Sequence, residues 1–457
     1  MTINQFNNIF FIGIAGSGMS AIAQYLKCIG KNVGGSDRYF IPDTQNETRS
    51  KLEAEGIKCF LQDGSGINNK TDLVVVSTAI EDTILEVQKA KELNIPILKR
   101  SQVLALITES KKTIAVGGTS GKSTTSAMIF DIMQYAGLEP SIISGAGLTS
   151  IIREGKIGNS KVGKGEWLVI EADESDGSIV QYNPKIGVLL NIEKDHQEID
   201  ELIKIFTVFR NNTKDVFITN RSNHLASSLT VNAENDFAVS EDVIAGFLGK
   251  NFKQKGFRIQ FDVNGTLFAM NTVGRHNMEN ALAALAVVSR VGVSLQKASE
   301  ALALYEGIYR RHQIIGEKNG VVLIDDYAHN PAKCAASIAA CQPVASKVIA
   351  WLQPHGYKPT RFLRADFVKE IVAVLRPEDE IWMSEIFYAG GSAIKDISAN
   401  DLIEDIKKLG KNAYFVEDRN KFVETVRSHF ASETVLLLMG ARDPSLELFA
   451  KEVFDKL

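Results

Sequence analysis

Gly118-Thr119-Ser120-Gly121-Lys122-Ser123-Thr124 is the stretch that decides the fold of the middle of this chain. The apolar run Thr113–Val116 before it predicts a strand, and a helix is expected from about Ser123. The backbone N–H groups of such a loop converge on phosphate oxygens, and the helix N-terminus adds a favourable partial charge. Lys122 can reach the β- and γ-phosphates of ATP, while the Ser123 hydroxyl can coordinate Mg²⁺. The loop is a variant of the P-loop, because Val116 stands where the strict pattern has glycine, and it predicts nucleotide binding.

Strands and helices alternate on both sides of this loop. Before it, we expect strands at Asn8–Ile14, Asp72–Ser77 and Ile95–Leu98, and helices at Ser20–Ile29 and Ile84–Leu93. After it come strands at Trp167–Ile170 and Ile186–Asn191, strand-like stretches around Phe257–Asn271 and a helix at Met278–Val291. A last series has strands at Val321–Asp325, Val348–Leu352, Glu380–Met383, Ala413–Val416 and Thr434–Met439. This alternation is typical of α/β proteins with parallel sheets. We expect three domains: a Rossmann-like N-terminal domain (1–109), a central P-loop ATP-binding domain (110–307) and a Rossmann-like C-terminal domain (308–457).

Composition describes a globular protein of the cytoplasm. The 457 residues carry a formal net charge of -4, which gives no electrostatic reason to expect a nucleic acid partner. No run of about 18 apolar residues is present, so no membrane partner is expected, and nothing resembles a secretion signal. The four cysteines show neither metal-ligand spacing nor a dense disulfide pattern, which fits a reducing compartment. We expect a monomer or a weak homodimer.

A second glycine loop, Gly13-Ile14-Ala15-Gly16-Ser17-Gly18, follows the first expected strand and leads into a helix. It can hold a diphosphate for the same physical reasons as the P-loop, although its spacing is not that of the dinucleotide fingerprint. Asp37 lies 19 residues beyond Gly18, where a carboxylate can bind a ribose hydroxyl. A tight structural turn is the alternative interpretation. Two phosphate loops in one chain favour a diphosphate-bearing substrate that meets ATP.

Acidic residues follow two of the expected strands of the central domain. Glu171-Ala172-Asp173-Glu174-Ser175-Asp176 comes directly after Trp167–Ile170, and Asn191-Ile192-Glu193-Lys194-Asp195-His196 ends the next strand. Ligands of α/β sheets bind at the carboxyl ends of strands, and carboxylates there can hold Mg²⁺. A solvated acidic turn is the alternative for the first stretch, and a structural histidine is the alternative for His196.

Ten short motifs occur in the order seen in the Mur ligases, and the resemblance covers almost the whole chain. They are GIAGSGMSAIA, GSD, VVVSTAI, GTSGKSTT, EADESD, NIEKDH, HNMENALAAL, RR, DDYAH and QPHGY. Resemblance to this family implies an ADP-forming ligase of peptidoglycan synthesis with ATP and Mg²⁺ as cofactors. The motifs are most similar to those of members that join L-alanine to UDP-N-acetylmuramate. Addition of another amino acid or of a peptide, as in recycling of the murein tripeptide, is the alternative.

The resemblance also implies a role for individual residues. Those expected at the UDP-sugar are Gly16, Ser17, Gly18, Met19, Ser20, Asp37 and Ser77. Those expected at ATP are Gly118, Thr119, Ser120, Gly121, Lys122, Ser123, Thr124, His276, Asn277 and Asn280. Ser123, Glu171 and His196 are expected to bind metal, and Arg310 or Arg311 to approach the γ-phosphate. The expected catalytic set consists of Lys122, Glu171, His196, Arg311, Asp326 and His329. The residues expected at the amine substrate are His355 and Tyr357.

The chain departs from the family pattern at three places, and the last two leave the amine substrate open. Ser120 and Ser123 replace the histidine and threonine of the family's P-loop, and Ser123 keeps the hydroxyl. In Gln353-Pro354-His355-Gly356-Tyr357-Lys358-Pro359, glycine and proline stand where two arginines are usual, and a lysine does not copy the forked geometry of a guanidinium. The C-terminal Gly440–Pro444 segment also differs from the family's. An NAD-dependent oxidoreductase and a non-catalytic sugar-nucleotide-binding regulator are alternatives from other classes, and the P-loop with its acidic residues argues against both.

Overall fold

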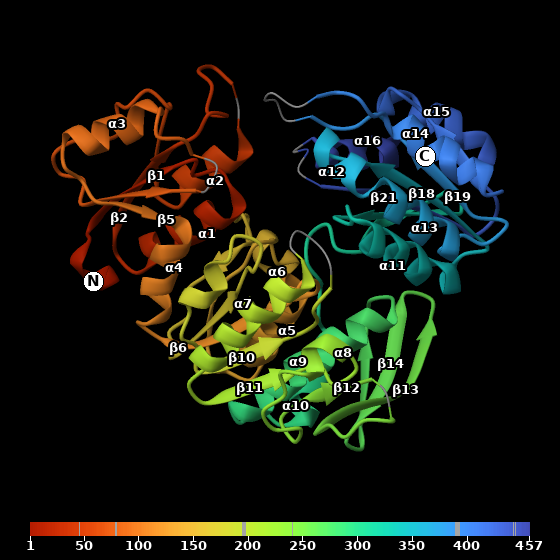
Figure 1. Cartoon of the computed structure of the whole chain (residues 1–457), viewed down its shortest axis with the longest axis horizontal. Coiled ribbons are helices and arrows are strands. Elements are labelled where there is room, and N and C mark those ends of the chain that lie inside the picture. The colour runs from red at the N-terminus through yellow and green to blue at the C-terminus, as the bar shows by residue number, and fades with distance from the viewer. Residues whose placement is uncertain are drawn as a thin grey trace. The chain divides into compact units, whose positions relative to one another are not determined.

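The computed structural model describes residues 1–44, 46–77, 80–193, 198–239, 241–388, 394–441, 443 and 445–457. The chain forms two compact units, and Figure 1 shows that sheets flanked by helices recur along it. The first unit comprises Met1–Asn251, Phe261–Met270 and Met278–Ile308. The second comprises Phe252–Gln260, Asn271–Asn277 and Tyr309–Leu457. The predicted α/β class with parallel sheets is confirmed.

The N-terminal part of the first unit contains a five-stranded parallel sheet in the order β3-β2-β1-β4-β5. Its strands are β1 (Asn8–Ile12), β2 (Asn32–Ser36), β3 (Lys58–Phe60), β4 (Leu73–Val76) and β5 (Ile97–Lys99). Its helices are α1 (Ser17–Cys28), α2 (Glu47–Ala54), α3 (Leu85–Glu92) and α4 (Arg100–Thr108). The strands of such sheets are short continuous apolar runs because both faces are covered, as β1 and β4 show.

A second sheet of the first unit has six strands in the order β11-β10-β6-β9-β7-β8, and only the β7–β8 pair is antiparallel among its described pairings. The strands are β6 (Lys112–Gly117), β7 (Ser141–Ile143), β8 (Ser160–Lys161), β9 (Trp167–Glu171), β10 (Ile186–Leu189) and β11 (Val216–Thr219). The helices are α5 (Lys122–Tyr135), α6 (Thr149–Ile152), α7 (Ile199–Asn212), α8 (His224–Ser227), α9 (Arg275–Arg290) and α10 (Leu295–Ala303). A small sheet follows, with β12 (Phe237–Ala238), β13 (Phe247–Lys255), β14 (Arg258–Val263) and β15 (Thr266–Met270) in sequence order.

The second unit contains a six-stranded sheet in the order β16-β17-β21-β18-β19-β20. The strands are β16 (Gln313–Lys318), β17 (Val321–Asp326), β18 (Lys347–Gln353), β19 (Glu380–Met383), β20 (Asn412–Phe415) and β21 (Thr434–Gly440). The helices are α11 (Pro331–Cys341), α12 (Tyr357–Phe362), α13 (Arg364–Val374), α14 (Ala399–Lys408), α15 (Phe422–Val426) and α16 (Leu446–Lys456). All strands are parallel except β16, which pairs antiparallel with β17. Strand β16 has no alternating apolar pattern and was not expected from the sequence.

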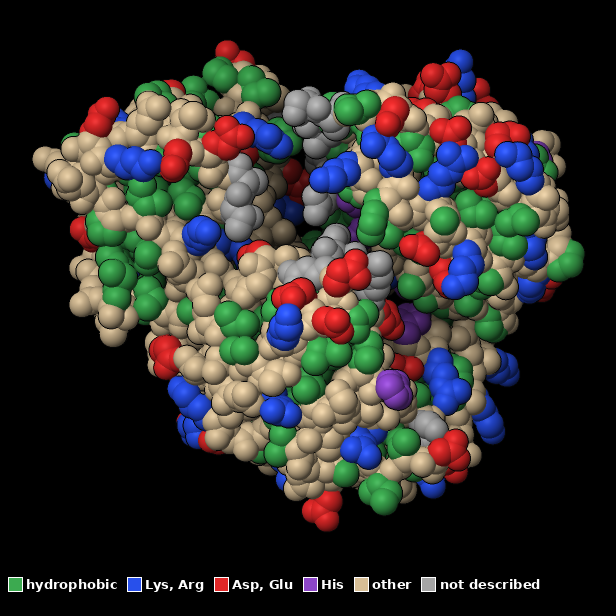
Figure 2. Space-filling view, viewed as in Figure 1, with side chains coloured by type: hydrophobic (Ala, Val, Ile, Leu, Met, Phe, Trp, Pro, Cys, Tyr) green, Lys and Arg blue, Asp and Glu red, His purple; other side chains and the backbone are tan. Residues whose placement is uncertain are grey.

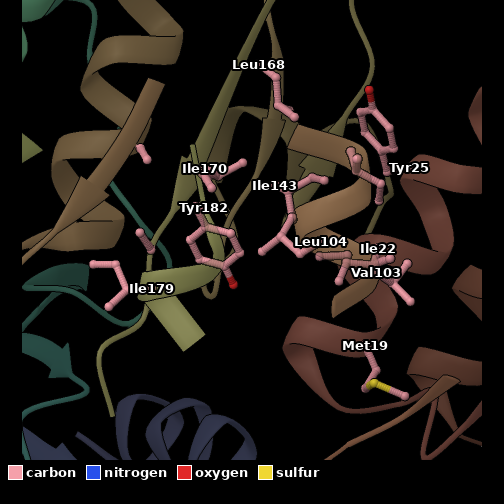
Figure 3. Packing of buried hydrophobic residues seen from close by; sticks show 14 of the residues in the cluster. Met19, Ile22, Tyr25, Val103, Leu104, Ile143, Leu168, Ile170, Ile179 and Tyr182 are labelled. Carbon is pink, nitrogen blue, oxygen red and sulfur yellow. The ribbon is translucent and has the colours of Figure 1, made fainter. Parts of the chain in front are cut away.

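One hydrophobic cluster joins the two larger sheets of the first unit. It includes side chains of α1 and α4, such as Tyr25 and Leu104, together with Leu168 and Ile170 of β9. Figure 3 shows these residues in the packed interior. Burial of apolar surface of this extent is the main favourable contribution to folding. The core therefore connects the helix that follows the first glycine loop to the sheet that carries the P-loop.

The surface in view in Figure 2 has acidic and basic side chains interspersed over it. Among the described residues, no helix is long and apolar enough to span a lipid bilayer.

Candidate active site

Three loops of the first unit begin at the carboxyl ends of adjacent central strands. The P-loop follows β6, the acidic stretch from Glu171 follows β9, and Asn191 lies just beyond the end of β10. Because β10, β6 and β9 are neighbours in the sheet, their loops meet at one edge. This edge is where α/β sheets bind ligands. The structure thus brings together the P-loop and acidic residues that the sequence singled out.

Asn191 holds the P-loop in its shape. Its Oδ1 accepts hydrogen bonds from the Ser120 backbone N–H at 2.9 Å and from the Thr119 hydroxyl at 2.9 Å. Its Nδ2 donates to the Ser120 carbonyl at 3.2 Å. The Thr119 hydroxyl in turn accepts from the N–H of Glu193 at 3.1 Å. Asn191 was quoted in the NIEKDH motif but was given no role, because one side-chain amide at a strand end gives no recognisable signal.

The turn into α5 requires glycine at position 121. Gly121 has a φ of 86°, and a Cβ there would lie 2.4 Å from the Asn280 Oδ1. Asn280 of α9 also accepts a hydrogen bond from the Thr125 hydroxyl at 3.3 Å. A helix that begins at Lys122 leaves its first N–H groups without intrahelical acceptors, so they are available to phosphate oxygens. Asn280 thus lies directly beside the predicted phosphate cradle.

Lys122 is held by a carboxylate of the acidic stretch. Its Nζ lies 2.7 Å from Glu174 Oε2 and 2.7 Å from the Gly118 carbonyl oxygen. Burial opposes the charge on Lys122, but Glu174, Asp173 and Glu171 outweigh it and raise the lysine pKa. The side chain is therefore a cation held next to the P-loop by its ion pair with Glu174.

The Ser123 hydroxyl and the Glu171 carboxylate form the best pair of oxygen ligands at this edge. The Ser123 Oγ lies 3.0 Å from both carboxylate oxygens, and the Gly145 N–H donates to Glu171 Oε2 at 2.7 Å. Among the described residues, no group of three or more His, Cys, Asp or Glu is gathered as a ready-made metal site. Mg²⁺ in phosphate-binding sites commonly has only one or two protein oxygen ligands, with phosphate and water completing its shell. The pair therefore fits a magnesium ion that binds together with nucleotide. His196, the second predicted metal ligand, lies outside the described residues.

The first glycine loop lies at the carboxyl ends of β1, β2 and β4, which are also adjacent. Helix α1 begins at Ser17 rather than at Ser20 as predicted, so Ser17, Gly18 and Met19 contribute its free N–H groups. Asp37 closes the loop, because its carboxylate accepts from Ala15 N–H at 2.9 Å and from Tyr39 N–H at 3.0 Å. Ser77 follows β4 at the same edge.

A polar contact buried under this loop joins it to the sheet of the P-loop. The side chains of Met19 and Ser20 are buried, so the backbone is the part of these residues that can meet a ligand. Asn159 donates from Nδ2 to the Ser17 carbonyl at 2.7 Å and to the Ser20 hydroxyl at 2.9 Å. Its Oδ1 accepts from Gln24 Nε2 at 2.8 Å. Asn159 belongs to no recognised motif, so it was not predicted from the sequence.

Arg100 links the first glycine loop to the acidic stretch, and it was not expected from the sequence. Its guanidinium lies 3.3 Å from the Asp176 carboxylate at the end of the acidic stretch. A Cβ at Gly18 would meet the Arg100 side chain at 3.0 Å, so the arginine lies directly against the N-terminus of α1. Arg100 therefore places a cation next to the predicted diphosphate loop.

The two predicted arginines of the second unit lie in different surroundings. Arg310 is 8% exposed, donates to Asp325 at 2.8 and 3.2 Å and also donates to the Gly440 carbonyl at 3.1 Å. Arg311 has its guanidinium carbon 5.2 Å from the centre of the Tyr327 ring. Because Arg310 is committed to Asp325, Arg311 is the better candidate for contact with a phosphate.

Asp326 anchors a histidine instead of standing open at its strand end. It accepts from His312 Nδ1 at 2.7 Å, from the Ser337 hydroxyl at 2.7 Å and from the Ala328 N–H at 2.9 Å. Burial opposes charge on both partners, yet each stabilises the other, so the pKa of His312 is raised and that of Asp326 is lowered.

Burial and the His312 charge lower the pKa of His276 to about 4. Asn277 donates to the Val273 carbonyl at 2.8 Å.

His355, expected at the amine substrate, lies beside His329 of the expected catalytic set. The ring centres of His329 and His355 are 5.3 Å apart. His329 has its Nδ1 2.8 Å from the Tyr327 carbonyl oxygen, and burial lowers its pKa to about 3. An Nδ1–H donor leaves Nε2 of this neutral imidazole as an acceptor. Tyr357 begins α12, and its ring is 5.5 Å from that of Tyr388.

These features are typical of an enzyme that binds a nucleotide at a P-loop. Three family models match successive parts of the chain: the Mur ligase family, catalytic domain (residues 8–112), the Mur ligase middle domain (116–288) and the Mur ligase, glutamate ligase domain (310–442). The chain belongs to the Mur ligase family, and it is an ATP-dependent, ADP-forming ligase.

Individual relatives resemble the chain over nearly its full length. A UDP-N-acetylmuramate–L-alanine ligase of Carboxydothermus hydrogenoformans is 34% identical over 452 residues, covering 95% of this chain and 93% of the relative. The enzyme of the same name from Syntrophomonas wolfei is 34% identical over 457 residues, covering 95% and 94%. The crystal structure of UDP-N-acetylmuramate–alanine ligase from Thermotoga maritima has a TM-score of 0.80 and 25% identity, covering 98% of each chain. A murein peptide ligase from Psychrobacter arcticus shares the fold, with a TM-score of 0.67 at 20% identity and 98% coverage of each chain.

Proposed function

We propose that the chain joins L-alanine to the carboxylate of UDP-N-acetylmuramate in peptidoglycan synthesis. The observation that carries the proposal is the meeting of P-loop, acidic stretch and Asn191 at one sheet edge, in a chain similar to L-alanine ligases over 95% of its length. Residues 1–109 would bind the UDP-sugar, residues 110–307 ATP, and residues 308–457 the amine. ATP and nucleotide-linked sugars are cytoplasmic metabolites, so the reaction is proposed for the cytoplasm.

The sugar carboxylate is first converted into a better electrophile. Transfer of the γ-phosphoryl group of ATP to a carboxylate oxygen gives an acyl phosphate and ADP. Such transfer depends mainly on positioning and on neutralising charge, which the P-loop N–H groups, Lys122 and Arg311 would provide. Mg²⁺ held by Ser123 and Glu171, with His196 at a second site, would neutralise charge on the phosphate oxygens.

The amine then attacks the acyl carbon, and the tetrahedral intermediate collapses with loss of phosphate. An attacking amine must be neutral, so a proton acceptor is needed near it. His329, which burial keeps neutral, would accept a hydrogen bond from the amine through Nε2 and orient it, and the proton would pass on to solvent because a base with so low a pKa does not retain it. Asp326, with its oxygens engaged by His312 and Ser337, would position the surrounding backbone.

A peptide or a different amino acid as the amine is the second candidate. A pocket of about 390 Å³ in the second unit is lined by Tyr357, Glu385, Lys395, Asp396, Ile397, Ser398 and Asp401. It contains groups of both charges, which suits a zwitterion, and its volume exceeds what a small amino acid fills. This favours testing a peptide beside L-alanine.

The experiment is a substrate comparison with purified protein, ATP, Mg²⁺ and UDP-N-acetylmuramate. Phosphate release and product mass are measured with L-alanine, glycine, L-serine and the L-Ala-γ-D-Glu-diaminopimelate tripeptide. The proposal predicts that L-alanine gives the largest kcat/KM and a product heavier by one alanine residue. A tripeptide adduct in its place would establish the second candidate. No product with any amine would overturn the assignment of UDP-N-acetylmuramate as substrate.

A further inference from the structure

Asn159 lies where helix α1 meets the sheet that carries the P-loop. It directly precedes β8, at the edge of that sheet, and the residue is only 2% exposed. Its two side-chain partners on α1, Ser20 and Gln24, are buried as well. Removing one partner of a buried hydrogen bond leaves the other unsatisfied, which is costly. The contact therefore fixes the place of α1 on this sheet.

The Asn159 side chain orients the first peptide group of α1. Its Nδ2 donates to the Ser17 carbonyl at 2.7 Å, and its Oδ1 is held by Gln24 Nε2 at 2.8 Å. The Ser17 carbonyl and the Gly18 N–H belong to one planar trans peptide group, so they point in opposite directions. A hydrogen bond on the carbonyl therefore aims the Gly18 N–H away from Asn159, and it strengthens that N–H as a donor.

The same hairpin holds the carboxylate of the proposed metal site. Strands β7 and β8 pair antiparallel, and the Asn159 carbonyl accepts from the N–H of Ser144, which follows β7, at 2.9 Å. The next N–H, that of Gly145, donates to Glu171 at 2.7 Å, and the Ser144 hydroxyl donates to Glu171 at 3.4 Å. A Cβ at Gly145 would lie 2.9 Å from Glu171 Oε2, so the close approach requires glycine. Asn159 thus contacts the first glycine loop with its side chain and the support of Glu171 with its backbone.

We propose that Asn159 is a positioning residue, which sets the first glycine loop at a fixed place relative to Glu171 and the P-loop. The inference rests on the proposed function, because it takes this loop to hold the diphosphate of the sugar nucleotide. Phosphoryl transfer requires the attacking carboxylate to lie in line with the γ-phosphate. A misplacement of about 1 Å can lower the rate about 100-fold. A buried residue that contacts the supports of both ligands prevents such a shift.

Two substitutions weaken this contact, and a third is the control. Asn159→Ala removes the donor to the Ser17 carbonyl. Gln24→Met keeps the bulk of its side chain and removes the hydrogen bond that holds Asn159 Oδ1, so it tests the proposal even if Asn159→Ala does not fold. Ser160→Ala changes the next residue of the hairpin. The Ser160 hydroxyl is buried and has no hydrogen-bond partner among the described residues, so its removal should change neither binding nor rate.

Calorimetry measures the Kd of UDP-N-acetylmuramate without ATP, and phosphate release with ATP, Mg²⁺ and L-alanine gives kcat and the KM of each substrate. In Asn159→Ala we expect the Kd to rise about tenfold and kcat to fall at least about tenfold at saturating substrates. Gln24→Met should show smaller changes in the same direction. The KM for ATP should stay within about twofold in every variant, because the backbone contact to Ser144 is retained. A role in folding alone would lower the melting temperature and the folded fraction, and would leave the Kd and every KM unchanged.

Unchanged Kd and kcat in Asn159→Ala would overturn the proposal, and so would equal losses in Ser160→Ala. If Asn159→Ala does not fold, unchanged values in Gln24→Met overturn it. Wild-type protein that binds UDP-N-acetylmuramate without forming product would refute the proposed function, and the Kd values of the variants would still decide the role of Asn159. Wild-type protein that does not bind this sugar nucleotide would overturn both.

Discussion

Replacing Ser123 by alanine perturbs the proposed metal site at a single atom. The hydroxyl lies 3.0 Å from both oxygens of Glu171, and it is the first side chain of α5 after the P-loop lysine to offer an oxygen ligand. A hydrogen bond to a charged group contributes about 1.5–3 kcal/mol. If the hydroxyl contributes the same amount when it binds the metal–nucleotide complex, kcat/KM for ATP falls about 10- to 150-fold.

Phosphate release at varied ATP and fixed Mg²⁺ measures this loss. Ser123→Thr keeps the hydroxyl and should retain most of the activity. Ser126→Ala is the matched control on the same helix, because the Ser126 hydroxyl is buried without a partner among the described residues, so its removal should leave kcat/KM unchanged. The reasoning is refuted if Ser123→Ala stays within about twofold of the wild type, or if Ser126→Ala is equally damaging.

Three further predictions concern the P-loop, the two arginines and pH. Asn191→Ala removes three hydrogen bonds of about 1 kcal/mol each from the P-loop, so the KM for ATP should rise at least about tenfold in steady-state kinetics. An unchanged KM would contradict the claim that Asn191 holds the P-loop in its shape. Arg311→Ala should lower kcat about 100-fold with an unchanged melting temperature, whereas Arg310→Ala strands a buried carboxylate and should cost about 3–5 kcal/mol in denaturant unfolding; the reverse pattern excludes Arg311 as the catalytic arginine. The raised pKa of His312 means that its pairing with Asp326 stabilises the fold fully below the unfolded histidine pKa of about 6.5 and less as pH rises through the folded value. The stability lost in His312→Gln should thus be largest near pH 6 and shrink in alkali, and a loss that grows with pH contradicts this.

Strong periodic signals allowed the sheets and the phosphate loops to be predicted from the sequence. The strand at Glu380–Met383 was predicted with the bounds that the structure has, and the central strands β6, β9 and β10 agree within a few residues. Buried parallel strands are continuous apolar runs, which a single sequence reveals. Strand β16 was missed because it is a half-exposed strand without alternation, paired only with β17 on one side.

The polar contacts that shape the site were mostly beyond prediction. Asn159 lies 142 residues from Ser17, and Arg100 lies 76 residues from Asp176, so only the folded chain brings them together. The sequence likewise gave no means of separating Arg310 from Arg311. Both guanidiniums lie near the Tyr327 ring, and only the folded chain shows that Arg310 is buried and paired with Asp325. Sequence motifs identify candidate residues, but the contacts made in the folded chain determine which of these residues can still bind a ligand.

Transfer of oxygen from substrate to phosphate tests the central claim most directly. UDP-N-acetylmuramate labelled with oxygen-18 in its carboxylate is incubated with the protein, ATP, Mg²⁺ and L-alanine, and the released phosphate is analysed by mass spectrometry. An acyl phosphate requires one carboxylate oxygen to leave with the phosphoryl group. We therefore predict one oxygen-18 atom in the phosphate for each amide formed. Amide formation with unlabelled phosphate, or with the label in AMP, would contradict an ADP-forming acyl-phosphate mechanism.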